Sequence, residues 1–122
     1  MKVELENKLF DKHPKILCKA NLPFGFECDD GWYEIIEELC RRITECLELR
    51  PDTPQVEAIQ VKQKFGGLRF YATGGNEITD HLIRDAETIS YKTCEGCGTM
   101  QNVSKRIIKG HWIIQLCDNC NG

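Results

Sequence analysis

Two Cys-x-x-Cys pairs decide the fold of this chain: Cys94-Glu95-Gly96-Cys97-Gly98 and Cys117-Asp118-Asn119-Cys120. Each pair bends around one ion because the two residues between its cysteines form a tight knuckle, and the nineteen residues that separate the pairs are typical of a zinc ribbon. Two short segments between the pairs, 103–108 and 111–116, read as strands joined by a two-residue loop at Lys109-Gly110. This hairpin would bring the two knuckles together.

The four cysteines predict one structural zinc ion, bound by Cys94, Cys97, Cys117 and Cys120. A soft, all-thiolate, tetrahedral site suits zinc and leaves no open position for chemistry. A rubredoxin-like iron site shares the paired cysteines, but nothing else in the sequence points to electron transfer. A thioredoxin-type redox pair is disfavoured because that motif lies at a strand-to-helix junction and is not duplicated. The motif therefore explains folding rather than function.

The chain of 122 residues is long enough for one domain, with an α+β body over 1–92 and the ribbon over 93–122. It has no run of eighteen apolar residues, and residues 1–15 carry charges where a signal peptide needs an apolar core. Four of the eight cysteines belong to the metal motif, which favours a reducing compartment. We expect a cytoplasmic protein without membrane segments.

The net charge is −3, and acidic residues outnumber basic ones mainly within residues 1–50. A protein that neutralises several phosphates normally carries a basic excess, so this balance counts against general affinity for duplex nucleic acid. It leaves room for one small basic pocket.

Two amphipathic helices are predicted. Apolar residues recur at helical spacing from Trp32 to Arg50, after N-cap candidates at Asp29 and Asp30, and again over 78–91 after a cap at Asn76. The lead-in before Trp32 has weak periodicity and reads as irregular or briefly helical.

Between the helices, residues 57–74 alternate strictly and predict a β-hairpin with its loop at Gly66-Gly67. That loop pairs Phe65 with Leu68, Lys64 with Arg69 and Lys62 with Tyr71. The inner face would then bury Phe65, Leu68 and Phe70 against both helices. The expected fold is therefore α+β: two helices packed on a hairpin, with the zinc ribbon at the C-terminal end.

The outer face of the hairpin would hold three cations and one aromatic ring: Lys62, Lys64, Arg69 and Tyr71. Like charges held opposite each other repel, so they need a ligand or a counter-charge. One interpretation is a binding site for a small anionic ligand. The other is a solvated face whose counter-charge comes from Glu57 or from acids of the first helix.

No nucleophile is flanked by a histidine and an acid in a recognisable arrangement, and no phosphate-binding loop such as a P-loop occurs. We therefore expect a protein that is not an enzyme.

Several segments together resemble a family of small phage and prophage proteins that end in a zinc ribbon. They are Asp30-Gly31-Trp32, the run 62–71 with its Lys-Phe-Gly-x-Leu-Arg-Phe-Tyr core, Ala86 with Ser90, and the two knuckles with Gly110 and Trp112 between them. The resemblance spans roughly residues 13–120. It implies a phage or prophage origin and a small accessory role, with no catalytic residues to carry over.

Three functions are compatible with these patterns. The first is capture of a nucleotide-derived anionic ligand by the Lys62, Lys64, Arg69 and Tyr71 face, through which a phage would blunt a host defence. The second is nucleic-acid binding by the ribbon through the residues Lys105, Arg106, Lys109, His111 and Trp112. The third is an adaptor that binds a host protein through the acidic first helix. The oligomeric state is left open.

Overall fold

The longest element in the computed structural model, which describes residues 1–121, is helix α2 at Tyr33–Leu49. Its buried side chains recur three and four residues apart, so they form one stripe along the helix. The N-cap expected from Asp29 and Asp30 is not made. A 3-10 turn over Asp30–Trp32 leads into α2 instead, without a side-chain cap. The stripe consists of Ile36, Leu39, Cys40, Ile43 and Cys46.

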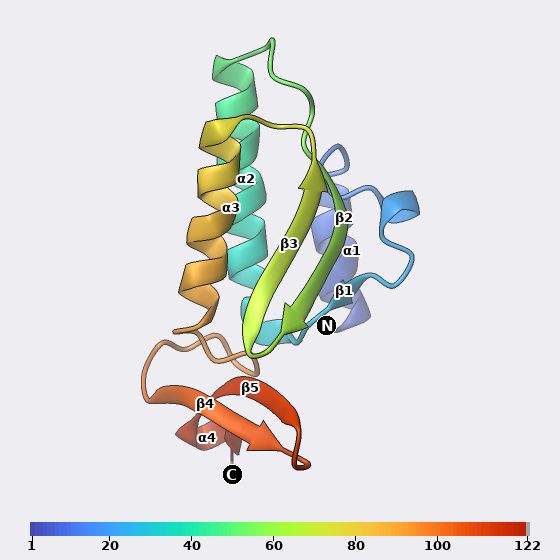
Figure 1. The fold of residues 1–122 in the computed structure, drawn as a ribbon. Coiled ribbons are helices and arrows are strands. Elements are labelled where there is room, and N and C mark those ends of the chain that lie inside the picture. The colour runs from blue at the N-terminus through green and yellow to red at the C-terminus, as the bar shows by residue number, and fades with distance from the viewer. Residues whose placement is uncertain (122) are drawn as a thin grey trace.

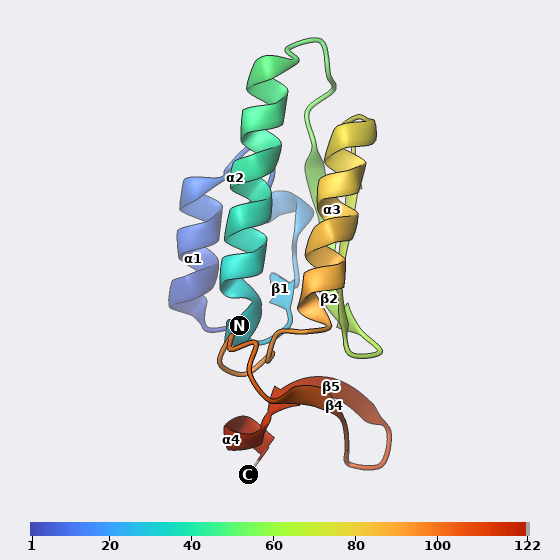
Figure 2. The same ribbon diagram turned by 90° about the vertical axis from the view of Figure 1, so that its left-hand side faces the viewer.

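Helix α3, Glu77–Ser90, runs antiparallel to α2 and lies beside it (Figures 1 and 2). As expected, Asn76 caps this helix: its side chain accepts from the Thr79 N–H, while the Thr79 hydroxyl accepts from the Asn76 N–H. The lead-in contains a further helix, α1 at Val3–Lys12, which flanks α2 on the side away from α3 (Figure 2). Helix α1 has a weak signal in the sequence because Leu9 is its one buried residue.

A three-stranded sheet in the order β1-β2-β3 packs against α2 and α3 (Figure 1). Strand β1 is Phe26–Glu27, β2 is Glu57–Lys64 and β3 is Gly67–Thr73. The short strand β1 pairs parallel to β2 and was not expected. The expected class, helices combined with small sheets, is confirmed.

The predicted register of the β2–β3 hairpin is wrong: the loop lies one residue earlier than expected, which shifts each cross-strand partner by two residues. Its loop is Phe65-Gly66, both in the left-handed region with φ of 52° and 84°, as a two-residue hairpin turn requires. Lys64 therefore pairs with Gly67. Further along, Lys62 pairs with Arg69 and Gln60 with Tyr71, and an irregularity at Ile59 shifts the register again.

This register turns Phe65 out of the core. Its side chain is 67% exposed at the tip of the hairpin, so the expectation that it is buried is wrong. Leu68 and Phe70 are buried as expected, together with Val61 and Ala58. They share one core with Trp32, with Ala86 of α3 and with four residues of the α2 stripe: Ile36, Leu39, Cys40 and Ile43.

Side chains of α3 cover the free edge of β3. The hydroxyl of Ser90, which is fully buried, accepts from the Leu68 N–H at 2.8 Å, and the Glu87 carboxylate accepts from the Phe70 N–H at 3.0 Å. These bonds satisfy backbone groups that an edge strand otherwise leaves open to pairing with another chain.

The ribbon lies below this body in Figure 1. Strands β4 (Val103–Ile108) and β5 (Trp112–Cys117) form an antiparallel pair, followed by the short helix α4, Asp118–Asn121. Ile108 pairs with Trp112, so the connecting loop contains His111 as well as Lys109-Gly110 and is one residue longer than predicted. Within residues 1–121, no helix combines the length and apolar character needed to cross a membrane.

The two phenylalanines at 65 and 70 give a matched test of the register. Phe70→Ala should lower the free energy of unfolding by about 3 to 5 kcal/mol because it empties a buried site. Phe65→Ala should change it by less than about 0.5 kcal/mol because the ring is exposed. Denaturant unfolding of both variants measures this, and a larger loss for Phe65→Ala would contradict the register.

Candidate metal centre and neighbouring surfaces

The sulfur atoms of Cys94, Cys97, Cys117 and Cys120 all lie within 4.8 Å of one another. The Sγ atoms of Cys97 and Cys117 are 3.7 Å apart. A tetrahedral thiolate site with metal–sulfur bonds of about 2.3 Å has sulfur–sulfur separations of roughly 3.8 Å, so the donor set fits a metal ion. The predicted cysteine cluster is therefore present and could hold a metal.

The surroundings of the cysteines favour a bound cation. Burial opposes ionisation of Cys94, but backbone hydrogen bonds from Cys117, Cys97 and Gly96 outweigh it and lower its pKa to about 6. Hydrogen bonding with Cys117 and Cys94 raises the pKa of Cys120 to about 12. A thiolate at Cys94 is thus favoured, whereas ionisation of the neighbouring Cys120 is opposed, and two thiolates at this distance would repel each other. A cation among the sulfurs would remove that repulsion.

The first knuckle is docked onto the turn that precedes α2. The Gly31 N–H donates to the Glu95 carbonyl at 2.7 Å, and the indole N–H of Trp32 donates to the Thr93 carbonyl at 3.1 Å. The Asp29 N–H donates to the Glu95 carboxylate at 3.0 Å. Through these three bonds the Asp29–Trp32 segment joins the body to the metal centre.

Gly31 has no room for a side chain at this joint. An added Cβ would lie 2.2 Å from the Cys94 carbonyl oxygen and 2.5 Å from that of Glu95, well inside contact distance. Both obstacles are backbone atoms, which cannot move aside as a flexible side chain can. Glycine at this position therefore permits the close approach of the body and the knuckle.

Glu95 was not predicted as a site residue, since an acid between two cysteines reads as a surface residue. It is 3% exposed, and burial raises the pKa of its carboxyl group to about 7. One carboxylate oxygen accepts from Asp29, while the other is buried without a hydrogen-bond partner among residues 1–121. Its backbone N–H donates to the Gln115 carbonyl at 2.8 Å, which links the first knuckle to β5.

The four predicted ligand residues lie on the outer face of the β2–β3 hairpin, but they do not all line one cavity. Lys62, Lys64 and Tyr71 line a shallow hollow of about 380 Å³ together with Ile59 and Gln60. The Arg69 guanidinium instead donates to the Tyr91 hydroxyl at 2.8 Å, which raises the pKa of Arg69. Gly67 makes room for that tyrosine, because an added Cβ there would lie 2.3 Å from its ring.

A second hollow, of about 630 Å³, lies between the sheet and the ribbon. Lys62 lines it as well, with Lys109 and Trp112 from the ribbon hairpin. Three acids, Glu27, Asp29 and Glu95, line the same hollow, so its charge is mixed. Of the other ribbon cations, Arg106 is bonded to Asp118 at 2.8 Å.

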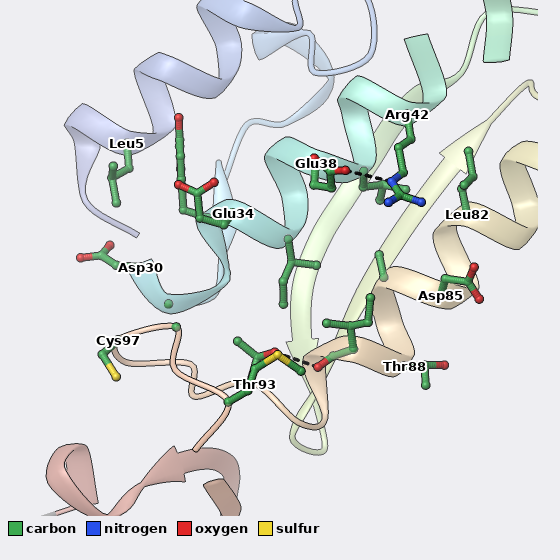
Figure 3. Close-up of a pocket in the computed structure, with 18 residues that line it drawn as sticks. Leu5, Asp30, Glu34, Glu38, Arg42, Leu82, Asp85, Thr88, Thr93 and Cys97 are labelled. Atoms are coloured by element: carbon green, nitrogen blue, oxygen red, sulfur yellow. Dashed lines mark hydrogen bonds and ion pairs between the residues drawn. The ribbon is translucent and has the colours of Figure 1, made fainter. Parts of the chain in front are cut away.

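A groove of about 770 Å³, larger than these two hollows, lies between α2, α3 and the first knuckle and is drawn in Figure 3. Apolar side chains of both helices line it, and carboxylates stand along its rim. Sequence reasoning did not find it because the groove arises only when the two helices lie side by side. The sequence indicates the groove only through Ile35 and Ile89, which lie at the margins of the two apolar stripes.

The close contact at Gly31 predicts that Gly31→Ala is destabilising. It should cost about 1 to 3 kcal/mol of unfolding free energy and speed hydrogen exchange at residue 31 and at the Trp32 indole, since the knuckle must move away. Asn119→Ala, on the exposed part of the second knuckle, should stay within about 0.5 kcal/mol and keep exchange slow. Unchanged exchange in Gly31→Ala would show that the joint is not closed as described.

Comparisons with protein-family models, with curated proteins and with solved structures found no match to this chain. Its function must therefore be inferred from the metal centre and from the three hollows around it.

Proposed function

We propose that the four cysteines bind one structural zinc ion. The support is the donor set itself: four thiol groups at tetrahedral spacing, without a histidine or a carboxylate among them. When bound, zinc would supply cross-linking and no chemistry, because four protein ligands leave no open position. The ribbon needs such a cross-link, since its own buried cluster comprises only Cys94, Leu116 and Cys117, with Val103, Ile108 and Ile114 partly buried beside it.

The proposed activity is the capture of a small anionic, nucleotide-derived ligand on the outer face of the hairpin, with the body of helices and hairpin as a rigid support. One observation carries this proposal. Lys62, Lys64 and Arg69 gather on one face, yet none of them has a carboxylate within 4.0 Å anywhere in residues 1–121. The counter-charge considered from Glu57 is not supplied, and Lys62 pairs directly across from Arg69.

The hollow beside these cations suits a phosphate attached to a planar ring. The two lysines lining it would make charge-assisted hydrogen bonds with phosphate oxygens. Tyr71 is 40% exposed and offers a ring face for a base. Arg69 would add its positive charge from the neighbouring position while its guanidinium is held by Tyr91. The ligand class is therefore a nucleotide with at least one accessible phosphate.

Binding without turnover is proposed because no carboxylate, imidazole, thiol or aliphatic hydroxyl group of residues 1–121 lines the hollow. The groups there are two amines, a phenol, an amide and an aliphatic side chain. A protein of this kind acts by stoichiometric sequestration. Together with the family resemblance, this makes a phage-encoded counter-defence role in the host cytoplasm our proposal.

Metal analysis tests the zinc assignment. Freshly purified protein should contain about one zinc per chain, and Cys117→Ser should lose most of it and melt at a lower temperature, because the ribbon loses its cross-link. Cys18→Ser, outside the cluster, should keep its metal. Iron in place of zinc, or a Cys117→Ser variant with full zinc content, would contradict the assignment.

Titration calorimetry with cyclic dinucleotides and ADP-ribose-type nucleotides tests the ligand proposal. The double variant Lys62→Ala/Lys64→Ala should bind at least about tenfold more weakly, since each charge-assisted hydrogen bond contributes about 1.5 to 3 kcal/mol. Arg69→Ala is less informative because it also removes the bond to Tyr91.

The matched control is Lys92→Ala/Lys105→Ala, which removes the same charge from exposed positions away from the hollow. It should bind like the unmodified protein. If no nucleotide binds, or if both double variants lose affinity equally, the hairpin face is a solvated surface and the proposal is wrong.

A further inference from the structure

We propose that the groove between α2 and α3 is a docking site for a basic amphipathic helix of a partner protein. The groove lies on the helix side of the molecule, away from the outer face of the hairpin, so this interaction is distinct from ligand capture. Its apolar lining, its shape and the charges on its rim each bear on the choice of partner.

The floor of the groove is apolar, and its margins leave apolar surface open. Leu39 and Ala86 are buried and close the floor over the core. Ile89 is 44% exposed and Met100 is 59% exposed at the margin. Exposed apolar side chains gathered in one concavity are typical of surfaces that bind other proteins. The groove thus leaves apolar surface of Ile89 and Met100 exposed, which a partner could bury.

The length of the groove fits a short helix. Tyr33 and Arg42 both line it and are nine residues apart on α2, which corresponds to about 14 Å along the helix axis. The knuckle residues Cys97, Gly98 and Met100 extend it at one end. About three turns of a partner helix would therefore lie along it, with apolar side chains at i, i+3 or i+4, and i+7 pointing to the floor.

The rim charges select a basic partner. Figure 3 shows Glu34 of α2 and Asp85 of α3 on opposite sides of the groove. Glu34 has no ion-pair partner in the described part of the chain, and Asp85 contacts only the exposed ring of His81, at 3.4 Å. Lysine or arginine side chains flanking the apolar stripe of a partner helix would meet one of these carboxylates on each side.

The remaining charges of the groove are already engaged. Glu38 bonds to both Arg41 and Arg42, and its contact with Arg41 lowers the pKa of Glu38. Arg42 is the only basic side chain of residues 1–121 that lines the groove. Asp30 contacts the exposed Lys2 at 3.8 Å. The charge open to a partner is therefore negative on both walls.

This charge pattern disfavours a second copy of the chain as the occupant. In a symmetric dimer built on the groove, Glu34 and Asp85 of one copy would face the same carboxylates of the other, and like charges across an interface are repulsive. A partner with cationic flanks has no such cost.

The test uses a designed helical peptide of about 18 residues, long enough to be partly helical in water, with leucines on one face and lysines beside them. Its counterpart carries glutamates in place of the lysines. Fluorescence anisotropy should show that the lysine peptide binds the unmodified protein and the glutamate peptide does not. The double variant Glu34→Lys/Asp85→Lys should reverse this preference and bind the lysine peptide at least about tenfold more weakly.

Glu48→Lys/Asp52→Lys is the charge-matched control, because both residues are exposed acids and neither lines the groove. It should bind the lysine peptide like the unmodified protein. Far-ultraviolet circular dichroism and thermal unfolding would verify that all variants are folded. Absence of lysine-peptide binding, equal binding of both peptides, or full binding by the double variant would overturn the proposal. Light scattering that reveals a dimer which Ile89→Glu dissociates would overturn it in favour of a second copy.

Discussion

The contact between Gly31 and the backbone of Cys94 and Glu95 is the constraint on which the arrangement of the molecule depends. It is made of backbone atoms, with a hydrogen bond of 2.7 Å and no space for a Cβ, so it fixes the body and the first knuckle at one distance. Trp32 reinforces it from the core side: its ring is fully buried in the body while its indole N–H reaches the Thr93 carbonyl. The cysteine cluster is thereby tied directly to the start of α2.

This joint also explains why a ribbon with little core of its own can shape two surfaces of the body. The first knuckle forms one end of the groove through Cys97 and Gly98, and Glu95 lines the hollow between the sheet and the ribbon. A metal that holds the knuckle closed would therefore stiffen both surfaces without touching any ligand. The metal would hold the knuckle in position and take no part in chemistry, because four thiolate ligands leave no open coordination site.

The sequence predicted the features that depend on short-range patterns. The cysteine cluster follows from spacing within each pair, both long helices follow from their periodicity, and the Asn76 cap follows from one residue.

The features that were not predicted depend on contacts between residues far apart in the sequence. Gly67 lies in a strand rather than in the turn, where the Tyr91 ring packs against it and leaves no room for a side chain, and Phe65 lies in the turn instead. The roles of Gly31 and Glu95 arise from their contact with each other. These residues are far apart in the sequence, so no local pattern encodes that contact. The groove likewise needs both helices in place.

The two layers of the body separate charge of opposite sign. The sheet's outer face carries Lys62, Lys64 and Arg69, none of which has a carboxylate within 4.0 Å in residues 1–121, whereas the helix side carries Glu34 and Asp85 around apolar surface. Salt bridges between these groups would neutralise both surfaces, but the packed sheet and helices keep them well beyond ion-pair distance. Because charges separated by more than a Debye length of about 8 Å are screened from each other at physiological salt, each surface acts on its own surroundings. A net charge of −3 therefore conceals one cationic and one anionic surface, and an anion on the hairpin and a basic helix in the groove would not compete.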